Sequence, residues 1–393
     1  MKKIKVLRII NRFNIGGPTY NATFLTRYLG DDFETLLIGG LPEAEEADSL
    51  HILEKYGVNP KLIEEMKRNP NLKSDRLAYK VIKSIIEDFK PDIVHTHAAK
   101  AGALGRKAAK AANVPIIIHT FHGHVFSGYF NPIKTSIFKI IERRLSKIST
   151  RIVAISPLQK EDLVNKYKIC TDHQTEIVPL GFDLTKFHQN KEENRSITRD
   201  LFHIEEDEIA IGIIGRLVPI KNHLFLIDVM KEISKSTHKK VRLFIVGDGE
   251  EKENIQREID NFHWPVNIKI EFTSWIKDIH IFNPGMDIIC LCSLNEGTPV
   301  SLIEAQAANI PVITTDVGGV KDIILNKKTG IIVTSNDKIE YTKQLLLLIE
   351  DDNFRMELSK EGWNHVKSKF HYTRLVEDMR QLYFKLLKEK NVI

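Results

Sequence analysis

Two glutamates, Glu296 and Glu304, follow an apolar run at residues 288–291 and flank a short helix-start signal. The residues directly after the first glutamate are Gly297, Thr298, Pro299 and Val300. Thr298 is a good N-cap and Pro299 suits the first helical position, so the spacing puts Glu304 about one and a half turns into a helix. Free amides at a helix start bind anions such as pyrophosphate, and carboxylates accept hydrogen bonds from sugar hydroxyls. The ordinary alternative is a capped helix with two exposed glutamates.

A pair of basic residues forms the second motif. Arg216 follows Gly215 at the end of an apolar run, residues 209–214, and Lys221 stands five positions after it. The glycine lets a ligand approach the backbone, while the guanidinium and ammonium groups both bind phosphate oxygens. Each residue alone could be a solvated loop cation. A basic pair and a carboxylate pair, each at a strand end, together indicate a nucleotide-sugar site.

Glycines follow two further apolar runs. Gly16 and Gly17 come after residues 5–10, where they let a helix N-terminus approach a phosphate or a sugar. Gly247 and Gly249 come after residues 242–246. Neither pair completes the G-x-G-x-x-G pattern, so the sequence gives little support to a dinucleotide-dependent dehydrogenase.

Histidines gather after two more apolar runs, at His95, His97, His119, His122 and His124. A histidine-based metal site is one interpretation, although no carboxylate or cysteine joins the group at ligand spacing. Hydrogen-bonded structural histidines are the ordinary alternative. No Asp-x-Asp occurs, so an obvious carboxylate pair for Mg²⁺ on a nucleotide diphosphate is missing.

Short apolar runs alternate with helix-like segments along the whole chain. Predicted strands are residues 5–10, 35–38, 93–95, 116–120, 151–155 and 176–178, then 209–214, 242–246, 268–272, 288–291, 311–314 and 330–333. Two such series predict an α/β protein of two doubly wound Rossmann-like domains facing a central cleft, because ligands of these sheets bind beyond the carboxyl ends of the strands. We expect domains at 1–190 and 200–372, joined across the charged stretch 183–204, and an amphipathic C-terminal helix within 373–393.

Composition sets broad limits on function. The chain has 393 residues and a net charge of +5, too small an excess to indicate nucleic-acid binding. Its three cysteines form no disulfide framework, which predicts a reducing, cytoplasmic compartment. The apolar N-terminus is interrupted by Arg8 and is interpreted as a buried strand. No apolar run has membrane-spanning length.

The ordered motifs resemble family 4 glycosyltransferases of the GT-B fold. Segments 91–97, 215–221 and 246–249, the glutamate pair and segment 315–320 occur in the family's order, and the match covers nearly the whole chain. The resemblance implies a retaining glycosyltransferase of polysaccharide biosynthesis that uses a nucleotide-sugar donor, most often a UDP-sugar, without a metal or other cofactor. It also implies that the C-terminal helix returns to the N-terminal, acceptor-side domain.

The resemblance assigns roles to single residues. Arg216 and Lys221 would hold the donor pyrophosphate, Glu304 the ribose, and Glu296 the transferred sugar, while His122 looks like the histidine near the reacting carbon. The donor-binding set would also include Gly16, Gly17, Gly215, Gly247, Gly297, Thr298, Pro299 and Val300. Three positions depart from the family pattern: Ser274 and Asn309 replace common glycines, and Asp322 replaces a common glutamate.

Other functions stay open at this point. A GT-B sugar-nucleotide epimerase, a phosphorylase and a catalytically silent binding subunit share the fold. The acceptor is expected to be a glycan or a lipid-linked intermediate. Basic and apolar residues alternate through 125–149, which indicates either a peripheral contact with the inner face of the membrane or a helix packed on its own sheet.

Overall fold

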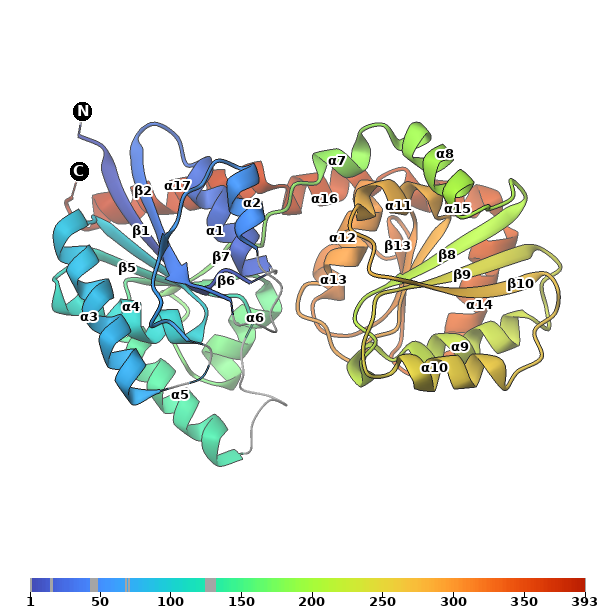
Figure 1. The fold of residues 1–393 in the computed structure, drawn as a ribbon, viewed down its shortest axis with the longest axis horizontal. Helices are drawn as coiled ribbons and strands as arrows, with labels where there is room; N and C mark the ends of the chain where they lie inside the picture. Colours follow the sequence, from blue (N-terminus) through green and yellow to red (C-terminus); the bar gives the residue numbers. More distant parts are fainter. Residues whose placement is uncertain are drawn as a thin grey trace. The chain divides into compact units, whose positions relative to one another are not determined.

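The computed structural model describes residues 2–14, 17–42, 49–67, 69, 71–123 and 132–392. The chain divides into two compact units, which Figure 1 shows. Met1–Phe182 and Phe370–Ile393 form the first unit, and Asp183–Lys369 forms the second. Gly16, His124 and the segment 125–131 lie outside the described residues.

The first unit is built on a seven-stranded parallel sheet of order β3-β2-β1-β4-β5-β6-β7. Its strands are β1 (Ile4–Arg12), β2 (Phe33–Gly40), β3 (Lys61–Leu62), β4 (Ile93–His97), β5 (Ile116–Phe121), β6 (Arg151–Ala154) and β7 (Thr175–Ile177). Six of these strands are predicted from the sequence, and β3 is not. Two exposed residues carry neither an apolar run nor a period, so β3 leaves no signal in the sequence.

Helices cover both faces of this sheet. They are α1 (Gly17–Arg27), α2 (Leu50–Lys55), α3 (Leu72–Phe89), α4 (Ala99–Ala111), α5 (Pro132–Ser146), α6 (Pro157–Glu161) and α17 (Tyr372–Glu389), with a π-helical turn at Asp162–Lys166. Right-handed crossovers place α3, α4 and α5 on one face, and α4 contacts both of its neighbours. The C-terminal helix α17 packs with α1 on the other face (Figure 1).

The second unit holds a six-stranded parallel sheet of order β10-β9-β8-β11-β12-β13. Its strands are β8 (Glu208–Ile214), β9 (Lys240–Val246), β10 (Ile268–Ser274), β11 (Ile288–Leu291), β12 (Val312–Thr315) and β13 (Gly330–Val333). All six strands are predicted from the sequence. Most of these parallel strands are buried on both faces and therefore read as continuous apolar runs, whereas the edge strand β10 is largely half-exposed.

Helices of the second unit also cover both faces of its sheet. They are α7 (Thr185–His188), α8 (Lys191–Leu201), α9 (His223–Ile233), α10 (Lys252–Asp260), α11 (Ile279–Gly285), α12 (Val300–Ala307), α13 (Val320–Ile323), α14 (Lys338–Glu350), α15 (Asp352–Ser359) and α16 (Gly362–Phe370), with a 3₁₀ turn at Pro219–Lys221. The core combines strand residues such as Ile211 and Leu243 with Tyr341 of α14.

Two chain segments run side by side where the units join. The Phe182 amide donates to the Phe370 carbonyl at 2.8 Å, and the Tyr372 amide donates to the Phe182 carbonyl at 3.0 Å. The second unit begins at Asp183, so residues 183–190, which the sequence analysis gives to the first domain, belong by their contacts to the second unit. The functional roles predicted for the two domains stay predictions.

Candidate active site

The loops after β8 and β11 meet at the topological switch point of the second sheet. Strands β9 and β10 lie on one side of β8, whereas β11, β12 and β13 lie on the other. Ligands of open α/β sheets bind at such a reversal, beyond the carboxyl ends of the strands. The predicted basic pair comes from the first of these loops and the predicted glutamate pair from the second, so the fold brings the two motifs together.

Lys221 and Glu296 form an ion pair across this switch point. The ammonium group donates to Glu296 Oε1, which also accepts a 2.6 Å hydrogen bond from Ser293 Oγ. The Glu296 side chain is 9% exposed and that of Lys221 21% exposed, so the pair is largely withdrawn from water. The sequence predicts both charges but neither their pairing nor the contribution of Ser293.

Arg216, on the same loop as Lys221, is exposed to solvent. Its loop is held by backbone hydrogen bonds, from the Gly215 amide to Val246 O at 2.9 Å and from the Leu217 amide to Asp248 O at 3.0 Å. A Cβ at Gly247, which has φ +140°, would lie only 1.9 Å from Gly215 O. Glycine is therefore required at Gly247 for the loops after β8 and β9 to approach each other.

The Glu296 loop is supported from β12. The Gly319 amide donates to Glu296 O at 3.1 Å, and a Cβ at Gly318, which has φ +51°, would lie 1.8 Å from the same oxygen. Thr315 Oγ1 donates to Ser293 O at 2.8 Å. The segment after β12 thus holds the backbone of the carboxylate loop, which explains why glycines follow this strand.

Helix α12 begins one residue later than the sequence predicts. Pro299 is the N-cap, with an extended ψ of 97°, and Val300 is the first helical residue. The Thr298 prediction is wrong because the Pro299 carbonyl accepts the first helical hydrogen bond, from the Leu302 amide at 3.2 Å. No side-chain cap is present at this helix start, so its amides stay available for a ligand.

Glu304 lies on α12 and is half-buried. Burial raises the pKa of its carboxyl group to about 7, and the nearby Lys186 ammonium of α7 acts in the opposite direction. No hydrogen-bond donor to this carboxylate is found among the residues that the structure describes. A carboxylate in this state gains from ligand hydroxyls that replace lost water.

The end of β10 carries an aromatic side chain beside the same loops. Trp275 is 57% exposed, and its ring lies 3.7 Å from where a Cβ on Gly247 would stand. Ser274, just before it, has φ +56°. This left-handed conformation explains why glycine is common at the position and why serine there is strained.

A buried hydrogen-bonded chain crosses the first sheet. An Arg8 NH group donates to the Tyr383 hydroxyl at 3.3 Å, and this hydroxyl lies 2.6 Å from His95 Nδ1. His95 Nε2 lies 2.7 Å from Thr120 Oγ1. A guanidinium can only donate, so the Tyr383 oxygen accepts from Arg8, and both His95 nitrogens are engaged, one by Tyr383 and one by Thr120. Burial, reinforced by Arg8, keeps the pKa of His95 well below its usual value.

His97 lies beside this chain, with its ring centroid 4.3 Å from that of His95, and it contacts His122. His97 Nδ1 lies 2.9 Å from His122 Nε2, and the two rings stack with centroids 5.1 Å apart. Burial lowers the pKa of His122 to about 3 and that of His97 well below its usual value. His122 is therefore a neutral hydrogen-bonding group rather than a cation at pH 7. Strands β4 and β5, which position these residues, are neighbours in the sheet.

The remaining predicted residues of the first unit are only partly placed. Gly17 is the first residue of α1, the helix that follows β1. Strand β1 borders the β1–β4 switch point of this sheet. Gly16 lies outside the described residues. His119 bonds Thr96 Oγ1 at 2.8 Å and does not join the His97–His122 pair. Both nitrogens of His95 are engaged by Tyr383 and Thr120, so His95 is not placed as a metal ligand. Within the described ranges, no group of three or more His, Cys, Asp and Glu side chains has metal-site geometry.

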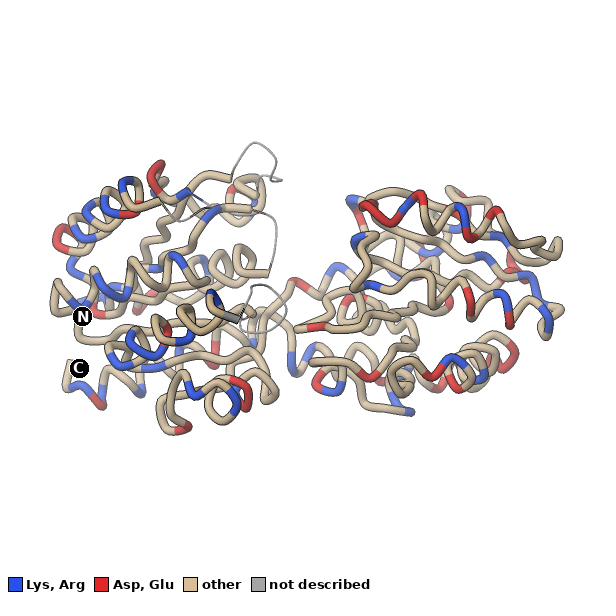
Figure 2. The backbone as a smooth tube through the Cα atoms, turned by 90° about the horizontal axis from the view of Figure 1, so that it is seen from below, with Lys and Arg blue, Asp and Glu red and all other residues tan. Residues whose placement is uncertain are grey.

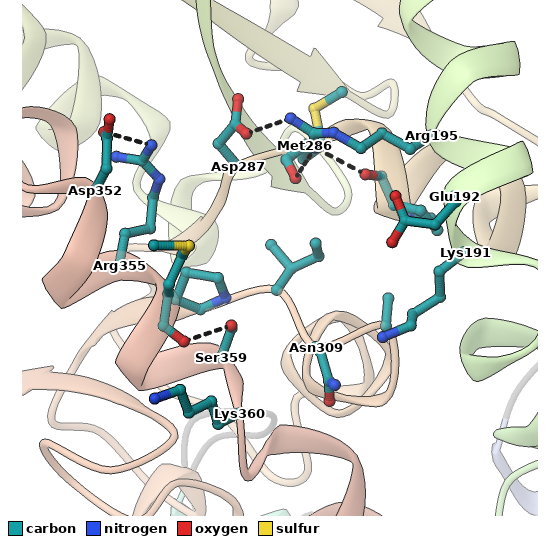
Figure 3. A pocket seen from close by; sticks show the side chains of 15 residues that line it. Lys191, Glu192, Arg195, Met286, Asp287, Asn309, Asp352, Arg355, Ser359 and Lys360 are labelled. Atoms are coloured by element: carbon teal, nitrogen blue, oxygen red, sulfur yellow. Dashed lines mark hydrogen bonds and ion pairs between the residues drawn. The ribbon is translucent and has the colours of Figure 1, made fainter.

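A cavity of about 790 Å³ lies at the opposite edge of the second sheet (Figure 3). Residues preceding β11 and β12 line it, together with parts of α8 and α15. Its charges are largely paired: Arg195 with Asp287 at 2.8 Å, and Arg355 with Asp352 at 2.8 Å. None of the predicted site residues lines this cavity, so it is separate from the switch-point site.

Fold and site together define a glycosyltransferase of the GT-B class. The family model "Glycosyltransferase Family 4" matches residues 16–186, and "Glycosyl transferases group 1" matches residues 194–365. The chain belongs to the family 4 glycosyltransferases, and the two matches fall one in each structural unit. The chain is thus an enzyme that transfers a sugar from a nucleotide-sugar donor.

Curated relatives include the Escherichia coli UDP-Gal:alpha-D-GlcNAc-diphosphoundecaprenol alpha-1,3-galactosyltransferase, 28% identical over 82% of this chain and 83% of that protein. The Staphylococcus aureus capsular polysaccharide biosynthesis glycosyltransferase CapM is 29% identical over 82% of this chain and 84% of its own length. Among solved structures, Anabaena Alr3699/HepE in complex with UDP superposes with a TM-score of 0.82 at 16% identity, over 97% of this chain and 100% of that one. This last likeness establishes the GT-B fold.

The helices give no sign of a bilayer-spanning segment. Among the residues described, none of them combines the length and the apolar character needed to cross a membrane.

Proposed function

We propose that this enzyme transfers a sugar from a UDP-sugar to a lipid-linked glycan intermediate, with retention of anomeric configuration and without a divalent metal. The observation that carries the proposal is the ion pair between Lys221 and Glu296 at the switch point of the second sheet. Arg216 lies on the same loop as Lys221, and Glu304 lies on helix α12, which follows Glu296. Cations suit the diphosphate, and carboxylates suit hydroxyls of ribose and sugar.

In the transfer, the bond from the anomeric carbon to the diphosphate breaks, and a bond to the acceptor oxygen forms on the same face. The acceptor proton passes to the departing diphosphate. Arg216 and Lys221 offset the charge that develops on this leaving group. Glu296 accepts hydrogen bonds from the sugar and Glu304 from the ribose. His122, in the first unit, takes the catalytic role that the family resemblance implies.

The choice of acceptor is supported by the relatives. Two of them are named for substrates that carry diphosphoundecaprenol or PP-undecaprenol. A lipid-linked acceptor puts the reaction at a membrane, and the free cysteines suit its inner, reducing side. We include a peripheral membrane contact through the region 125–149 in the proposal.

A donor panel tests the proposal. UDP-, GDP- and ADP-sugars are offered to the purified protein with detergent-solubilised lipid diphosphate saccharides, and the product is analysed by NMR for anomeric configuration. Transfer from a UDP-sugar with retention, at equal rates in the presence and absence of a chelator, is the expected result. Inversion of configuration would contradict the proposed retention. Turnover that is lost in chelator and restored by Mg²⁺ or Mn²⁺ would contradict the proposed metal independence.

A further inference from the structure

Helix α5 exposes an isoleucine stripe to solvent. Ile133, Ile137, Ile140 and Ile141 share one side of the helix and are 74%, 51%, 46% and 37% exposed. The opposite side, with Glu142 and Leu145, is buried. Because a helix normally buries its apolar side against its own sheet, a second apolar side facing outward requires another explanation.

Buried contacts fix the orientation of α5. Arg106 of α4 donates to Glu142 at 2.7 Å, and both side chains are almost fully buried. Arg143 donates to the carbonyls of Tyr167 and Lys168 at 2.7 and 3.0 Å, and the Lys139 ammonium lies 4.7 Å from the centroid of the Tyr167 ring. These contacts hold the isoleucine stripe outward, and they make Lys139 and Arg143 unsuitable as surface probes.

Positive charge is concentrated in the same layer of helices. The residues of α3, α4 and α5 carry net charges of +1, +4 and +3, together +8, whereas the whole chain carries +5. The rest of the chain is therefore net negative, by 3 charges. The only acidic residue of α4 and α5, Glu142, is neutralised inside by Arg106. Figure 2 shows runs of basic residues along helices of this unit. Exposed basic residues of α4, α5 and the turn after α5 are Lys107, Lys110, Lys134, Arg143, Arg144 and Lys147.

We propose that the outer face of α4 and α5, made of the isoleucine stripe and these exposed basic residues, docks on an anionic lipid bilayer. An apolar stripe bordered by lysine and arginine is suited to interfacial insertion with the cations among lipid phosphates. An acidic protein would match the charge but gives no reason for four exposed isoleucines. The proposal rests on the proposed function, since it brings a lipid-linked acceptor to the enzyme.

The position of the stripe along α5 fits this role. Strand β5 ends at Phe121, His122 follows it, and α5 begins at Pro132. In a βαβ crossover the helix starts near the carboxyl edge of the sheet, which is also the edge of His122. The stripe occupies the first turns of α5, and the exposed Arg144 and Lys147 follow at its far end. The proposed inserted part therefore lies toward the edge of the first sheet at which His122 follows β5.

A charge-reversal variant and a matched control test the electrostatic part. Lys110→Glu, Arg144→Glu, Lys147→Glu is compared with Lys327→Glu, Lys328→Glu, Lys388→Glu, which changes the net charge equally at exposed positions elsewhere. Co-sedimentation uses vesicles of phosphatidylglycerol and phosphatidylcholine at low salt. Each basic residue near the surface contributes about fivefold in affinity, so the first variant should bind at least roughly 100-fold more weakly and the control like wild type. Equal loss in both variants overturns the proposal.

An isoleucine variant tests insertion. Ile133→Gln, Ile137→Gln, Ile141→Gln keeps the charge, and circular dichroism checks that it stays folded. Vesicle binding should fall at least tenfold, and what is left should depend more steeply on salt, because only charge attraction remains. Wild-type vesicle affinity in this variant would mean adsorption by charge alone. That result overturns the proposal and favours an acidic partner.

Activity measurements separate this surface from the proposed function. Transfer to a detergent-solubilised acceptor should be the same in the wild type and in both α5 variants, whereas transfer to the same acceptor in vesicles should fall with vesicle binding. A wild-type enzyme that transfers sugar but ignores anionic vesicles overturns the docking surface. One that binds vesicles as described but transfers no sugar overturns the proposed function and leaves the surface supported.

Discussion

The ammonium group of Lys221 donates to Glu296 Oε1 across the switch point of the second sheet, although the two residues are 75 positions apart. The proposed phosphate-binding cation is thus paired with the proposed sugar-binding carboxylate. A diphosphate that enters the site offers Lys221 a stronger anionic partner, and Glu296 is then free to accept hydrogen bonds from hydroxyls. Donor binding and the readiness of Glu296 are coupled in this arrangement.

Lys221→Ala should weaken binding of UDP by about 1.5–3 kcal/mol, because a charge-assisted hydrogen bond to phosphate is lost. It should also lower stability, since the 9% exposed Glu296 loses its cation. Isothermal titration and thermal unfolding measure the two effects. Lys235→Ala, at an exposed lysine of the turn after α9, serves as the control and should change neither.

A double variant separates the two roles of this pair. Adding Glu296→Gln to Lys221→Ala removes the uncompensated carboxylate, so stability should recover while UDP affinity stays low. Recovery of affinity together with stability would show that Lys221 acts only through the fold, and the phosphate assignment would then be abandoned.

His97 is expected to hold the His122 imidazole in place through the 2.9 Å contact between His97 Nδ1 and His122 Nε2. An asparagine amide can occupy the place of Nδ1, whereas leucine cannot hydrogen-bond. His97→Asn should therefore keep most of kcat, and His97→Leu should lose it by roughly tenfold or more, with KM for the donor unchanged in both. Equal losses of kcat in both variants would show that His97 contributes only by packing.

His122 should contribute to the transfer step rather than to nucleotide binding. His122→Ala is expected to cripple turnover while UDP affinity stays near that of the wild type. Burial lowers the pKa of His122 to about 3, so His122 does not titrate between pH 5 and 8. Any inflection of kcat in that pH range should therefore be the same in the wild type and in His122→Ala. Full turnover in His122→Ala would leave it a structural role.

Most strands were predictable because they are buried parallel strands and so continuous apolar runs, whereas the exposed two-residue strand β3 left no such signal. The motifs were predictable as positions at strand ends. Their partners were not: Tyr383 meets His95 across 288 residues, and no local pattern signals such a contact. The outward isoleucines of α5 were equally hidden, because one apolar period fits burial and exposure alike. The arrangement of strands and helices in space, rather than the local sequence, determines both the Tyr383–His95 contact and the exposure of the α5 isoleucines.

The carboxyl group of Glu304 should make stability and donor binding respond oppositely to pH. Its folded pKa of about 7 lies above its ordinary value near 4.5, so the stability it contributes is fully present below pH 4.5 and is lost as the pH rises through 7. Without donor, Glu304→Gln should flatten this fall in Tm. Hydroxyl groups of the ribose favour the ionised form, so UDP affinity should rise through pH 7 more in the wild type than in Glu304→Gln. Identical pH profiles in the two proteins would remove Glu304 from the donor site.

Ser274 should be a point of backbone strain that glycine relieves. Its φ of +56° lies in the left-handed region, which costs an L-residue about 1–2 kcal/mol, whereas glycine adopts it freely. Ser274→Gly should therefore stabilise the protein by roughly 0.5–1 kcal/mol, part of the gain being offset by the greater entropy of unfolded glycine. Chemical unfolding measures the change, and UDP titration tests whether the substitution leaves donor affinity unchanged. Ser236→Gly, at an exposed serine whose φ is not positive, is the matched control and should destabilise slightly. If both substitutions destabilise equally, the left-handed conformation of Ser274 stores no strain, and its departure from the family's glycine has no energetic consequence.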